Sequence, residues 1–549
     1  MNEIETKLHQ SIKEVVNESF NYNPEDGLVM IETPKDNSNG DYSTNIAMRL
    51  TKILHQNPQI IAKTIVEGLT KKLDDVDKIE IAGPGFINFW IKKTALADII
   101  NTAISLNEDF GKNDSGNGLK ILVEYVSANP TGPLHCGHAR GAAWGDVICR
   151  LLKKSGYDVL REYYINDAGH QIDMLGESIY QRYLESYGLE FHLPDDGYHG
   201  QDVKEIMEEI KKDVGDKYLH TTKEEAVKFF RWEGRTRELE RIKKDLKYYR
   251  CEFDSWVSEQ WIVDENRVEK SLEKMIEMGL TYQQDGALWF KSTEYGDDKD
   301  RVLKKSDGYY TYLTPDIANH MYKYERGYEK LVNLWGADHH GYIARMKAAI
   351  QALGHQKDSL EVDLIQMVRL VENGQEVMMS KRTGNAITIR ELVDDIGCDA
   401  ARYFFISKAV DTHMDLDLGL ARSQSTDNPV FYAQYAYARI CKLLKQAPEL
   451  TVLDHYDLLT DQKEVELLKL MGSFTKVVAD AAATRAPNKM CNYIQKLSQA
   501  VHAYYGSDCK VNDPNNAELT SQRVALLSAV KVTLHNALDL IGVDALETM

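Results

Sequence analysis

The stretch KILVEYVSANPTGPLHCGH, residues 120–138, decides the expected fold. It opens with a short β-prone run, 121–126, of the kind that forms buried strands. A loop rich in Pro and Gly follows, and then a helical pattern runs from about His135 to Ser155. Strand character resumes at 159–165. Strand, loop, helix and strand form a βαβ unit, which predicts a parallel sheet with a right-handed crossover.

The sequence on either side of this unit shows other secondary-structure patterns. Before residue 112, helical periodicity is combined with strand-like alternation at 79–91, which indicates a small α/β domain. Residues 167–279 are rich in Glu and Lys and mainly helical. Strand signals return at residues 288–290, 309–313 and 331–334. This order predicts a helical insertion within a doubly wound sheet.

The last part of the chain has a helical pattern throughout. It begins at Asn428-Pro429, where the asparagine can cap a helix and the proline suits its first position. Further helices are expected at 461–483, 487–505 and 520–541. The predicted fold class is therefore α/β: a Rossmann-type doubly wound parallel sheet with a helical insertion, a small N-terminal α/β domain and an all-helical C-terminal bundle.

Composition limits the class of protein. The 549 residues are 43% hydrophobic, and no apolar run approaches the roughly 18 residues of a membrane span. The polar first twenty residues do not resemble a secretory signal, so we expect a cytoplasmic protein. Seven cysteines without a CxxC pair indicate free thiols rather than a disulfide framework or a zinc knuckle. The net charge of −19 does not decide for or against RNA, because binding depends on where the basic groups cluster.

The first motif that carries chemistry is HxGH, residues 135–138, at the point where the loop becomes a helix. Free backbone N–H groups and the helix dipole favour phosphate at such a place. His135 and His138 can donate hydrogen bonds to a triphosphate, and Gly137 allows an adenine to approach the backbone closely. The alternative is a pair of histidines at a helix end without a ligand.

The second motif runs from Met378 to Asn385 and contains Ser380, Lys381 and Arg382 before a Gly-Asn turn. A loop of this kind could close over phosphates, and Lys381 would neutralise charge as pyrophosphate leaves. Alone, the segment is better explained as a solvated basic turn. Together with HxGH upstream, it favours a nucleotide-binding function.

Both motifs resemble the HIGH and KMSKS signatures of class I aminoacyl-tRNA synthetases. Further phrases resemble the arginyl-tRNA synthetase family, at residues 40–45, 82–87, 123–138, 310–318, 336–342, 399–404 and 537–549. Two positions depart from the signature, since Met378 replaces its first lysine and Arg382 replaces its final serine. The first departure concerns how the loop holds ATP more than it concerns the family.

The resemblance implies an arginine–tRNA ligase of four parts. These are an N-terminal domain that binds the tRNA elbow, a class I catalytic domain with its helical insertion, a connecting stem and a helical anticodon-binding domain. We place them at residues 1–112, 113–390 (insertion about 167–285), 391–428 and 429–549. The implied partners are L-arginine, tRNA(Arg) and ATP with Mg²⁺ as a substrate complex. We expect no membrane or DNA partner, and a monomer.

The arginine pocket needs carboxylates, because the substrate presents a guanidinium group and an amino group that are both cationic. By resemblance, Tyr312 and Asp316 contact the guanidinium side. The residues expected around the amino and carboxylate groups are Glu124, Ser127, Asn129 and His138. Without the resemblance, Asp316 reads as a helix cap and Tyr312 as a strand aromatic in the core.

The expected ATP site combines both motifs with a third segment, 336–340. By resemblance, Asp338 and His339 lie near the ribose and adenine. The ATP-binding residues are then His135, Gly137, His138, Gly336, Asp338, His339, Ser380 and Lys381. The paired histidines beside Asp338 could instead suggest zinc, but no further ligands stand at suitable spacing, so no tightly bound metal is expected.

Catalysis would rest on positioning and on charge neutralisation by His135, His138 and Lys381, without a protein nucleophile. In this family, activation of arginine usually requires bound tRNA. Two alternatives stay open. One is a class I synthetase for another amino acid, and the other is a non-catalytic tRNA-binding paralogue.

Overall fold

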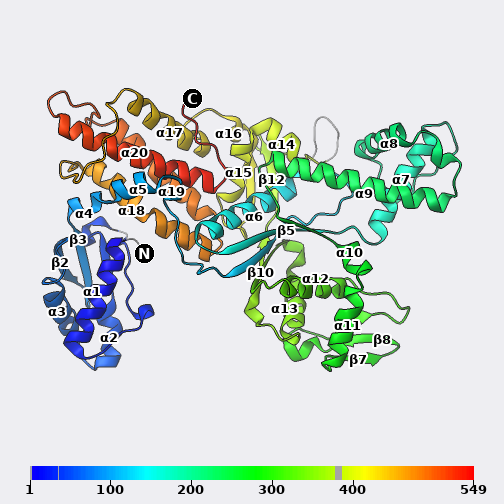
Figure 1. Ribbon diagram of the computed structural model, residues 1–549, viewed down its shortest axis with the longest axis horizontal. Helices are drawn as coiled ribbons and strands as arrows, with labels where there is room; N and C mark the ends of the chain where they lie inside the picture. The colour runs from blue at the N-terminus through cyan, green and yellow to red at the C-terminus, as the bar shows by residue number, and fades with distance from the viewer. Residues whose placement is uncertain (1–2, 35, 378–385) are drawn as a thin grey trace.

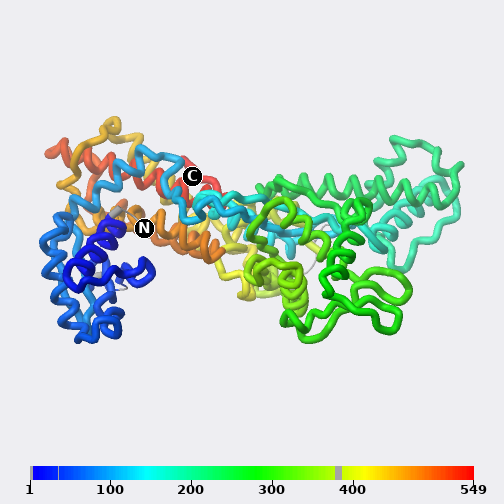
Figure 2. Tube along the Cα trace, turned by 60° about the horizontal axis from the view of Figure 1, so that its bottom comes forward, coloured from blue at the N-terminus to red at the C-terminus, as the bar shows by residue number. Residues whose placement is uncertain are grey.

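The computed structural model describes residues 3–34, 36–377 and 386–549. The molecule is elongated (Figure 1). The N-terminal domain and the C-terminal helices lie at one end, the parallel sheet lies in the middle, and α7 and α8 lie at the other end. Figure 2 shows the same order from a second direction. No helix among the described residues is long and apolar enough to cross a membrane.

The N-terminal domain is a helical layer on a three-stranded antiparallel sheet of order β1-β3-β2. Its main elements are α1 (Glu3–Phe20), β1 (Tyr42–Thr44), α2 (Ile46–Leu54), α3 (Pro58–Leu69), β2 (Val76–Ala82) and β3 (Phe86–Ile91). The helical periodicity expected before residue 112 includes α1, whose side chains Leu8, Ile12 and Val16 are at most 1% exposed. The alternation at 79–91 is the β2–β3 hairpin, as predicted.

The central sheet has five strands in the order β11-β10-β4-β5-β6, and every pair is parallel. Its strands are β4 (Lys120–Glu124), β5 (Asp158–Ile165), β6 (Ser255–Ser258), β10 (Lys330–Gly336) and β11 (Leu360–Ile365). The predicted βαβ unit is β4, α6 (Cys136–Lys154) and β5. The strand order reverses between β4 and β10, which is where doubly wound sheets bind ligands. The predicted fold class is confirmed.

The segment after β5 is helical but contains one strand of the main sheet. Its helices are α7 (His170–Glu185), α8 (Gln201–Val214), α9 (Lys223–Tyr248), α10 (Glu259–Asp264) and α11 (Arg267–Glu277). Between α9 and α10, β6 joins the edge of the parallel sheet beside β5. The range expected for the insertion, about 167–285, therefore includes a strand that belongs to the catalytic sheet.

Two of the three later strand expectations need correction. The signal at 288–290 is β8 (Ala287–Phe290), which lies in a separate antiparallel sheet with β7 (Thr281–Gln284) and β9 (Arg301–Lys304). The strand expected at 309–313 is wrong, because Tyr310 forms only an isolated bridge with Lys304 and α12 (Leu313–Glu325) begins there. Aromatic residues suggest a strand, but Pro315 sits in the first turn of a helix, where proline is tolerated.

The C-terminal helices form a bundle. They are α17 (Pro429–Lys445), α18 (Gln462–Ala483), α19 (Asn488–Tyr505) and α20 (Ala517–Leu540). The predicted cap is confirmed, since the Asn428 side chain accepts a hydrogen bond from the Val430 N–H at 3.0 Å. Between sheet and bundle lie α14 (Ile389–Ile396), α15 (Cys398–Ile406), β14 (Met414–Asp417) and α16 (Leu418–Arg422).

Candidate active site

The loop after β4 has an unusual backbone. Val126 and Ser127 have backbone φ angles of 68° and 41°, in a region that residues other than glycine rarely adopt. Ser127 is fixed from two sides, because its N–H donates to the Tyr125 carbonyl at 3.0 Å and its Oγ accepts from the Tyr164 N–H on β5 at 3.0 Å. Such strained positions gather at functional sites, where surrounding contacts hold them.

The two histidines of HxGH form a cap at the start of α6. Nδ1 of His135 accepts from the Gly137 N–H at 3.1 Å, and Nδ1 of His138 accepts from the His135 N–H at 3.3 Å. Partial burial lowers the pKa of both side chains, to about 4 for His138, where His135 lowers it further. Both rings are therefore neutral near pH 7. Because each Nδ1 accepts a bond, each proton sits on Nε2, which remains a donor.

Gly137 has a structural role that the sequence did not reveal. A Cβ atom at this position would lie 2.8 Å from Cε1 and 2.9 Å from Nδ1 of His135. That contact is too short for real atoms, so any other residue would displace the imidazole. The glycine is thus required by the His135 cap itself, independently of any adenine.

The second motif lies outside the described residues, and this includes Met378, Ser380 and Lys381. The chain that follows it contacts the first motif directly. The Cys136 N–H donates to the Ile387 carbonyl at 2.8 Å, and the Ile389 N–H donates to the Leu134 carbonyl at 2.8 Å. The two motifs, far apart in sequence, are therefore joined through the residues that flank the second one.

A cluster of carboxyl groups lies near the carboxyl ends of the sheet strands. Burial, and then Glu124, raise the pKa of Asp316 on α12 to about 6, although the Tyr342 hydroxyl donates to Oδ2 at 2.5 Å. Burial, and then Asp316 and Asp167, raise the pKa of Glu259 at the start of α10 to about 8. Asp316 thus opposes the ionisation of Glu259.

Asp167 and Tyr164 belong to the same cluster and differ in their hydrogen bonding. Asp167 is compensated, because Arg235 donates to it at 2.8 Å and the Gln260 N–H donates to it at 3.0 Å. The Tyr164 hydroxyl is buried and has no hydrogen-bond partner among the described residues. Burial, and then Glu259 and Asp316, raise the pKa of Tyr164 well above its ordinary value. Within the residues that the structure describes, this cluster thus holds two carboxyl groups without an ion-pair partner and a hydroxyl without a hydrogen bond.

The predicted arginine-binding residues fall into two places. Glu124 lies at the end of β4 and pairs with Lys323, while the Asn129 amide donates to Gln171 on α7. Tyr312 lies at the start of α12 with 89% of its surface exposed, so it is not a core aromatic. Asp316, one turn later, is not a cap, because α12 has no side-chain cap bond. Both structural alternatives are therefore wrong.

The third segment of the expected ATP site follows β10. Gly336 ends this strand, and a 3₁₀ turn, Ala337–Tyr342, contains Asp338 and His339. Their side chains are 80% and 57% exposed and lie 3.5 Å apart, His339 Nε2 to Asp338 Oδ2. Since β10 is parallel to β4, these residues lie at the same edge of the sheet as Glu124.

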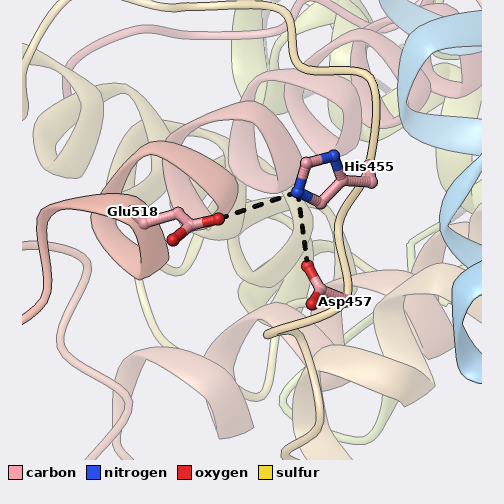
Figure 3. Close-up of side chains that lie close together, drawn as sticks. All are labelled: His455, Asp457 and Glu518. Carbon is pink, nitrogen blue, oxygen red and sulfur yellow. Dashed lines mark ion pairs between the residues drawn. The ribbon is translucent and has the colours of Figure 1, made fainter.

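One group of side chains in the described part of the chain has the spacing of metal ligands, and it is far from the predicted site in sequence. It consists of His455, Asp457 and Glu518 (Figure 3). Nε2 of His455 lies 3.8 Å from Asp457 Oδ1 and 3.7 Å from Glu518 Oε1. All three side chains are more than half exposed, as in ordinary surface ion pairs. The expectation of no tightly bound metal stays a prediction.

Some residues of the site were missed from the sequence. Tyr342 was inside a phrase that resembles the family, and Glu259 stands directly after a strand that the sequence did not predict. Glu162 and Lys323 carry no local signal, because their partners come from other elements. Only the strand register, known from the structure, brings them to Glu124.

A parallel sheet in this order, with HxGH after its first strand, defines the catalytic fold of a class I aminoacyl-tRNA synthetase. The family description "tRNA synthetases class I (R), catalytic domain" matches residues 100–417. "Arginyl tRNA synthetase N terminal domain" matches 2–91, and "DALR anticodon binding domain" matches 433–549. The chain belongs to the arginyl-tRNA synthetase family.

Named relatives agree with this assignment. The chain is 51% identical to arginine–tRNA ligase 1 of Halalkalibacterium halodurans over 527 residues, 95% of this chain and 94% of the relative. It is 50% identical to arginine–tRNA ligase of Bacillus subtilis over 525 residues, with the same coverage. The structure of Thermus thermophilus arginyl-tRNA synthetase has a TM-score of 0.75, covers 99% of both chains and is 21% identical, so it supports the fold.

Proposed function

We propose that the protein is an arginine–tRNA ligase that activates L-arginine with ATP and transfers it to tRNA(Arg). The observation that carries the proposal is the pair Asp316 and Glu259, which has no ion-pair partner in the described part of the chain and whose pKa values are raised to about 6 and about 8. A guanidinium group, planar and always charged, would relieve their repulsion and could pair with both.

The substrate would lie along the carboxyl ends of the strands. Its guanidinium group pairs with Asp316 and Glu259, and Tyr312 and the buried Tyr164 hydroxyl offer further contacts. The α-amino group lies toward Glu124. The groups expected around the amino and carboxylate ends are Ser127, Asn129 and His138.

ATP would bind at the same edge. The Nε2–H groups of His135 and His138 donate to phosphate oxygens, and α6 directs its positive end toward them. Asp338 and His339 lie toward the ribose and adenine, next to Gly336 and Gly137. Ser380 and Lys381 supply the remaining phosphate contacts, with Mg²⁺ entering as part of the ATP substrate.

The chemistry needs no nucleophile from the protein. A carboxylate oxygen of arginine attacks the α-phosphorus of ATP, and the bond to the bridging oxygen breaks, which releases pyrophosphate and leaves arginyl-adenylate. The terminal ribose hydroxyl of the tRNA then attacks the arginyl carbonyl carbon, loses its proton and displaces AMP. His135, His138 and Lys381 act by positioning and by balancing phosphate charge.

The tRNA would contact several parts of the chain. We assign the elbow to residues 1–112 and the anticodon to 429–549, joined to the catalytic part, 113–390, by the stem 391–428. The matched N-terminal and anticodon-binding descriptions support this division. Action as a monomer and a cytoplasmic location stay predictions.

ATP–pyrophosphate exchange with each amino acid in turn, with and without total tRNA, tests the proposal. We expect exchange with arginine alone, and only when tRNA is present. Exchange with a different amino acid would assign the chain to another class I activity. No exchange under any condition would favour a non-catalytic tRNA-binding protein.

A further inference from the structure

A row of polar side chains stands at neighbouring positions on adjacent strands of the parallel sheet, next to the proposed arginine site. The strand register places Asn333 of β10 beside Glu124 of β4, Glu124 beside Glu162 of β5, and Glu162 beside Ser255 of β6. Asn333, Glu124 and Glu162 are at most 7% exposed. Polar groups are costly at such a depth, so each needs a partner.

The partners come from one helix, α12, which covers this face. Nε2 of His320 lies 2.8 Å from the Asn333 amide nitrogen. Nζ of Lys323 donates to Oε2 of Glu124 and lies 3.7 Å from Oε1 of Glu162. Arg326, directly after the helix, donates to Oε2 of Glu162 at 2.6 Å. The helix and the residue that follows it thus supply a polar partner for each of Asn333, Glu124 and Glu162.

Lys323 resolves a conflict that the strand register creates. Neighbouring strands lie about 4.8 Å apart, so Glu124 and Glu162 are two carboxylates held side by side in a buried place. The Lys323 side chain has no exposed surface and lies between them. Burial alone would raise the pKa of Glu124, but Lys323 first, and then His320 and Ser127, hold it below its ordinary value.

The two carboxylates do not depend on Lys323 equally. Glu162 already accepts from Arg326 and from Ser255 Oγ, the latter at 3.1 Å. Glu124 has Lys323 as its ion-pair partner, and it stands at the end of β4, next to the loop that carries Ser127. Asp316 lies two turns before Lys323 on the same helix. Lys323 therefore links the carboxylate expected at the amino group to the helix that presents the carboxylate expected at the guanidinium.

We propose that Lys323 is a positioning residue that keeps Glu124 ionised and oriented, and thereby sets the affinity of the enzyme for arginine rather than for ATP. The inference rests on the proposed function, because it assigns the amino group of arginine to Glu124. Lys323 itself is fully buried behind Glu124 and acts through it.

The test is the Michaelis constant for arginine and for ATP in Lys323→Met between pH 6.5 and 9, with saturating tRNA. Without Lys323, burial favours the protonated form of Glu124, so the KM for arginine should rise about tenfold at pH 7, the effect of one pKa unit. The KM for ATP should change less than twofold. The ratio of variant to wild-type KM for arginine should shrink as the pH rises, because Glu124 then ionises without help.

The other titratable groups that face Glu124 affect this ratio less. Burial, Asp316 and Asp167 raise the pKa of Glu259 in both proteins, so its titration cancels in the ratio. Glu124 raises and Lys323 lowers the pKa of Asp316, so these two contributions oppose each other when Lys323 is removed and Glu124 becomes protonated. His320, with a pKa of about 4 caused by burial and then by Lys323, is neutral throughout the range in the wild type. Glu162 keeps its Arg326 partner in both proteins. An equal loss for arginine and ATP, or a ratio independent of pH, would show that Lys323 is merely structural and overturn the inference.

Lys330→Met is the matched control. Lys330 also pairs with a glutamate on the neighbouring strand, Glu361, but at the other end of β10. The same substitution there removes a lysine–glutamate pair from the same sheet and should leave the KM for arginine within twofold of the wild type.

The double variant Glu124→Gln/Lys323→Met keeps the test valid if Lys323→Met alone does not fold, because it removes one charge of each sign. If Lys323 acts through Glu124, the double variant should have the same KM for arginine as Glu124→Gln, within about twofold. A further multiplicative loss would overturn the inference. Failure of the wild type to activate arginine would instead refute the proposed function, so the two failures are distinguishable.

Discussion

Two pairs of acidic side chains lie in the same site and differ in one respect. Glu124 and Glu162 stand side by side on neighbouring strands, with Lys323 and Arg326 supplied by the protein. In the second pair, Asp316 opposes the ionisation of Glu259, and the pKa values of the two groups are raised to about 6 and about 8, by burial first and by neighbouring acids next. We call the first pair the finished pair, because the protein supplies its cations. We call the second the receptor pair, because no ion-pair partner for it stands among the described residues and we propose that it receives the guanidinium group.

The difference explains how one site can be both rigid and selective. Removing a partner from the finished pair should damage the fold, because it leaves a buried charge uncompensated. Removing a carboxylate from the receptor pair should damage binding and spare the fold, because it relieves repulsion. The following predictions separate these outcomes, from the largest expected effect to the smallest.

Lys323→Met should lower the free energy of unfolding by about 3 kcal/mol, the typical cost of breaking a buried ion pair from one side. Chemical denaturation at pH 7, with Lys330→Met as the control for a partly exposed pair, measures this. Unchanged stability in Lys323→Met would mean that the two pairs do not differ as described.

Asp316→Asn should lower kcat/KM for arginine about 100-fold, since a charge-assisted contact to the guanidinium contributes up to about 3 kcal/mol. Its free energy of unfolding should not fall, because the folded state already disfavours this charge at neutral pH. Steady-state aminoacylation and denaturation of the same preparation give both numbers. A large loss of stability would assign Asp316 to the structural group instead.

Glu259→Gln should raise the KM for arginine about tenfold at pH 7, because one of two paired carboxylates remains. The effect is smaller than for Asp316, since Glu259 must first lose a proton to bind the guanidinium at this pH. The KM for ATP serves as the internal control and should stay within twofold.

The KM for arginine in the wild type should fall about fivefold between pH 7 and pH 8, as a group with a pKa of about 8 ionises. The sign follows from the raised pKa: the carboxylate form binds the cation and becomes more populated as pH rises. Because the pKa of this carboxyl group is raised in the folded protein, the group should contribute less to the stability of the substrate-free protein at pH 8 than at pH 7. A KM that is already flat in this interval would contradict the account of Glu259, and Glu259→Gln should abolish the change.

The sequence allowed the fold class, the βαβ unit and the position of HxGH at a helix start to be predicted, because strand periodicity, the loop and the helix start are all local signals. The strand expected at 309–313 was wrong because the aromatic run precedes a helix that begins at Leu313. The receptor pair could be half predicted: Asp316 lies in a phrase that resembles the family, whereas Glu259 follows a strand, β6, hidden in a helical segment.

The contacts of the finished pair could not be predicted from the sequence. Glu124, Glu162 and Lys323 are separated by 38 to 199 residues and meet only through strand register and helix packing. The left-handed backbone of Val126 and the contact that excludes a Cβ at Gly137 are likewise properties of the folded chain.

The central claim is that uncompensated carboxylates select a cationic side chain, and citrulline tests it most directly because it replaces the guanidinium with a neutral group of nearly the same shape. ATP–pyrophosphate exchange would be measured with arginine and with citrulline at equal concentration, with tRNA present. The account predicts exchange with arginine and a rate for citrulline at least about 100-fold lower, matching the loss expected for an unpaired buried charge. Comparable exchange with both would contradict it.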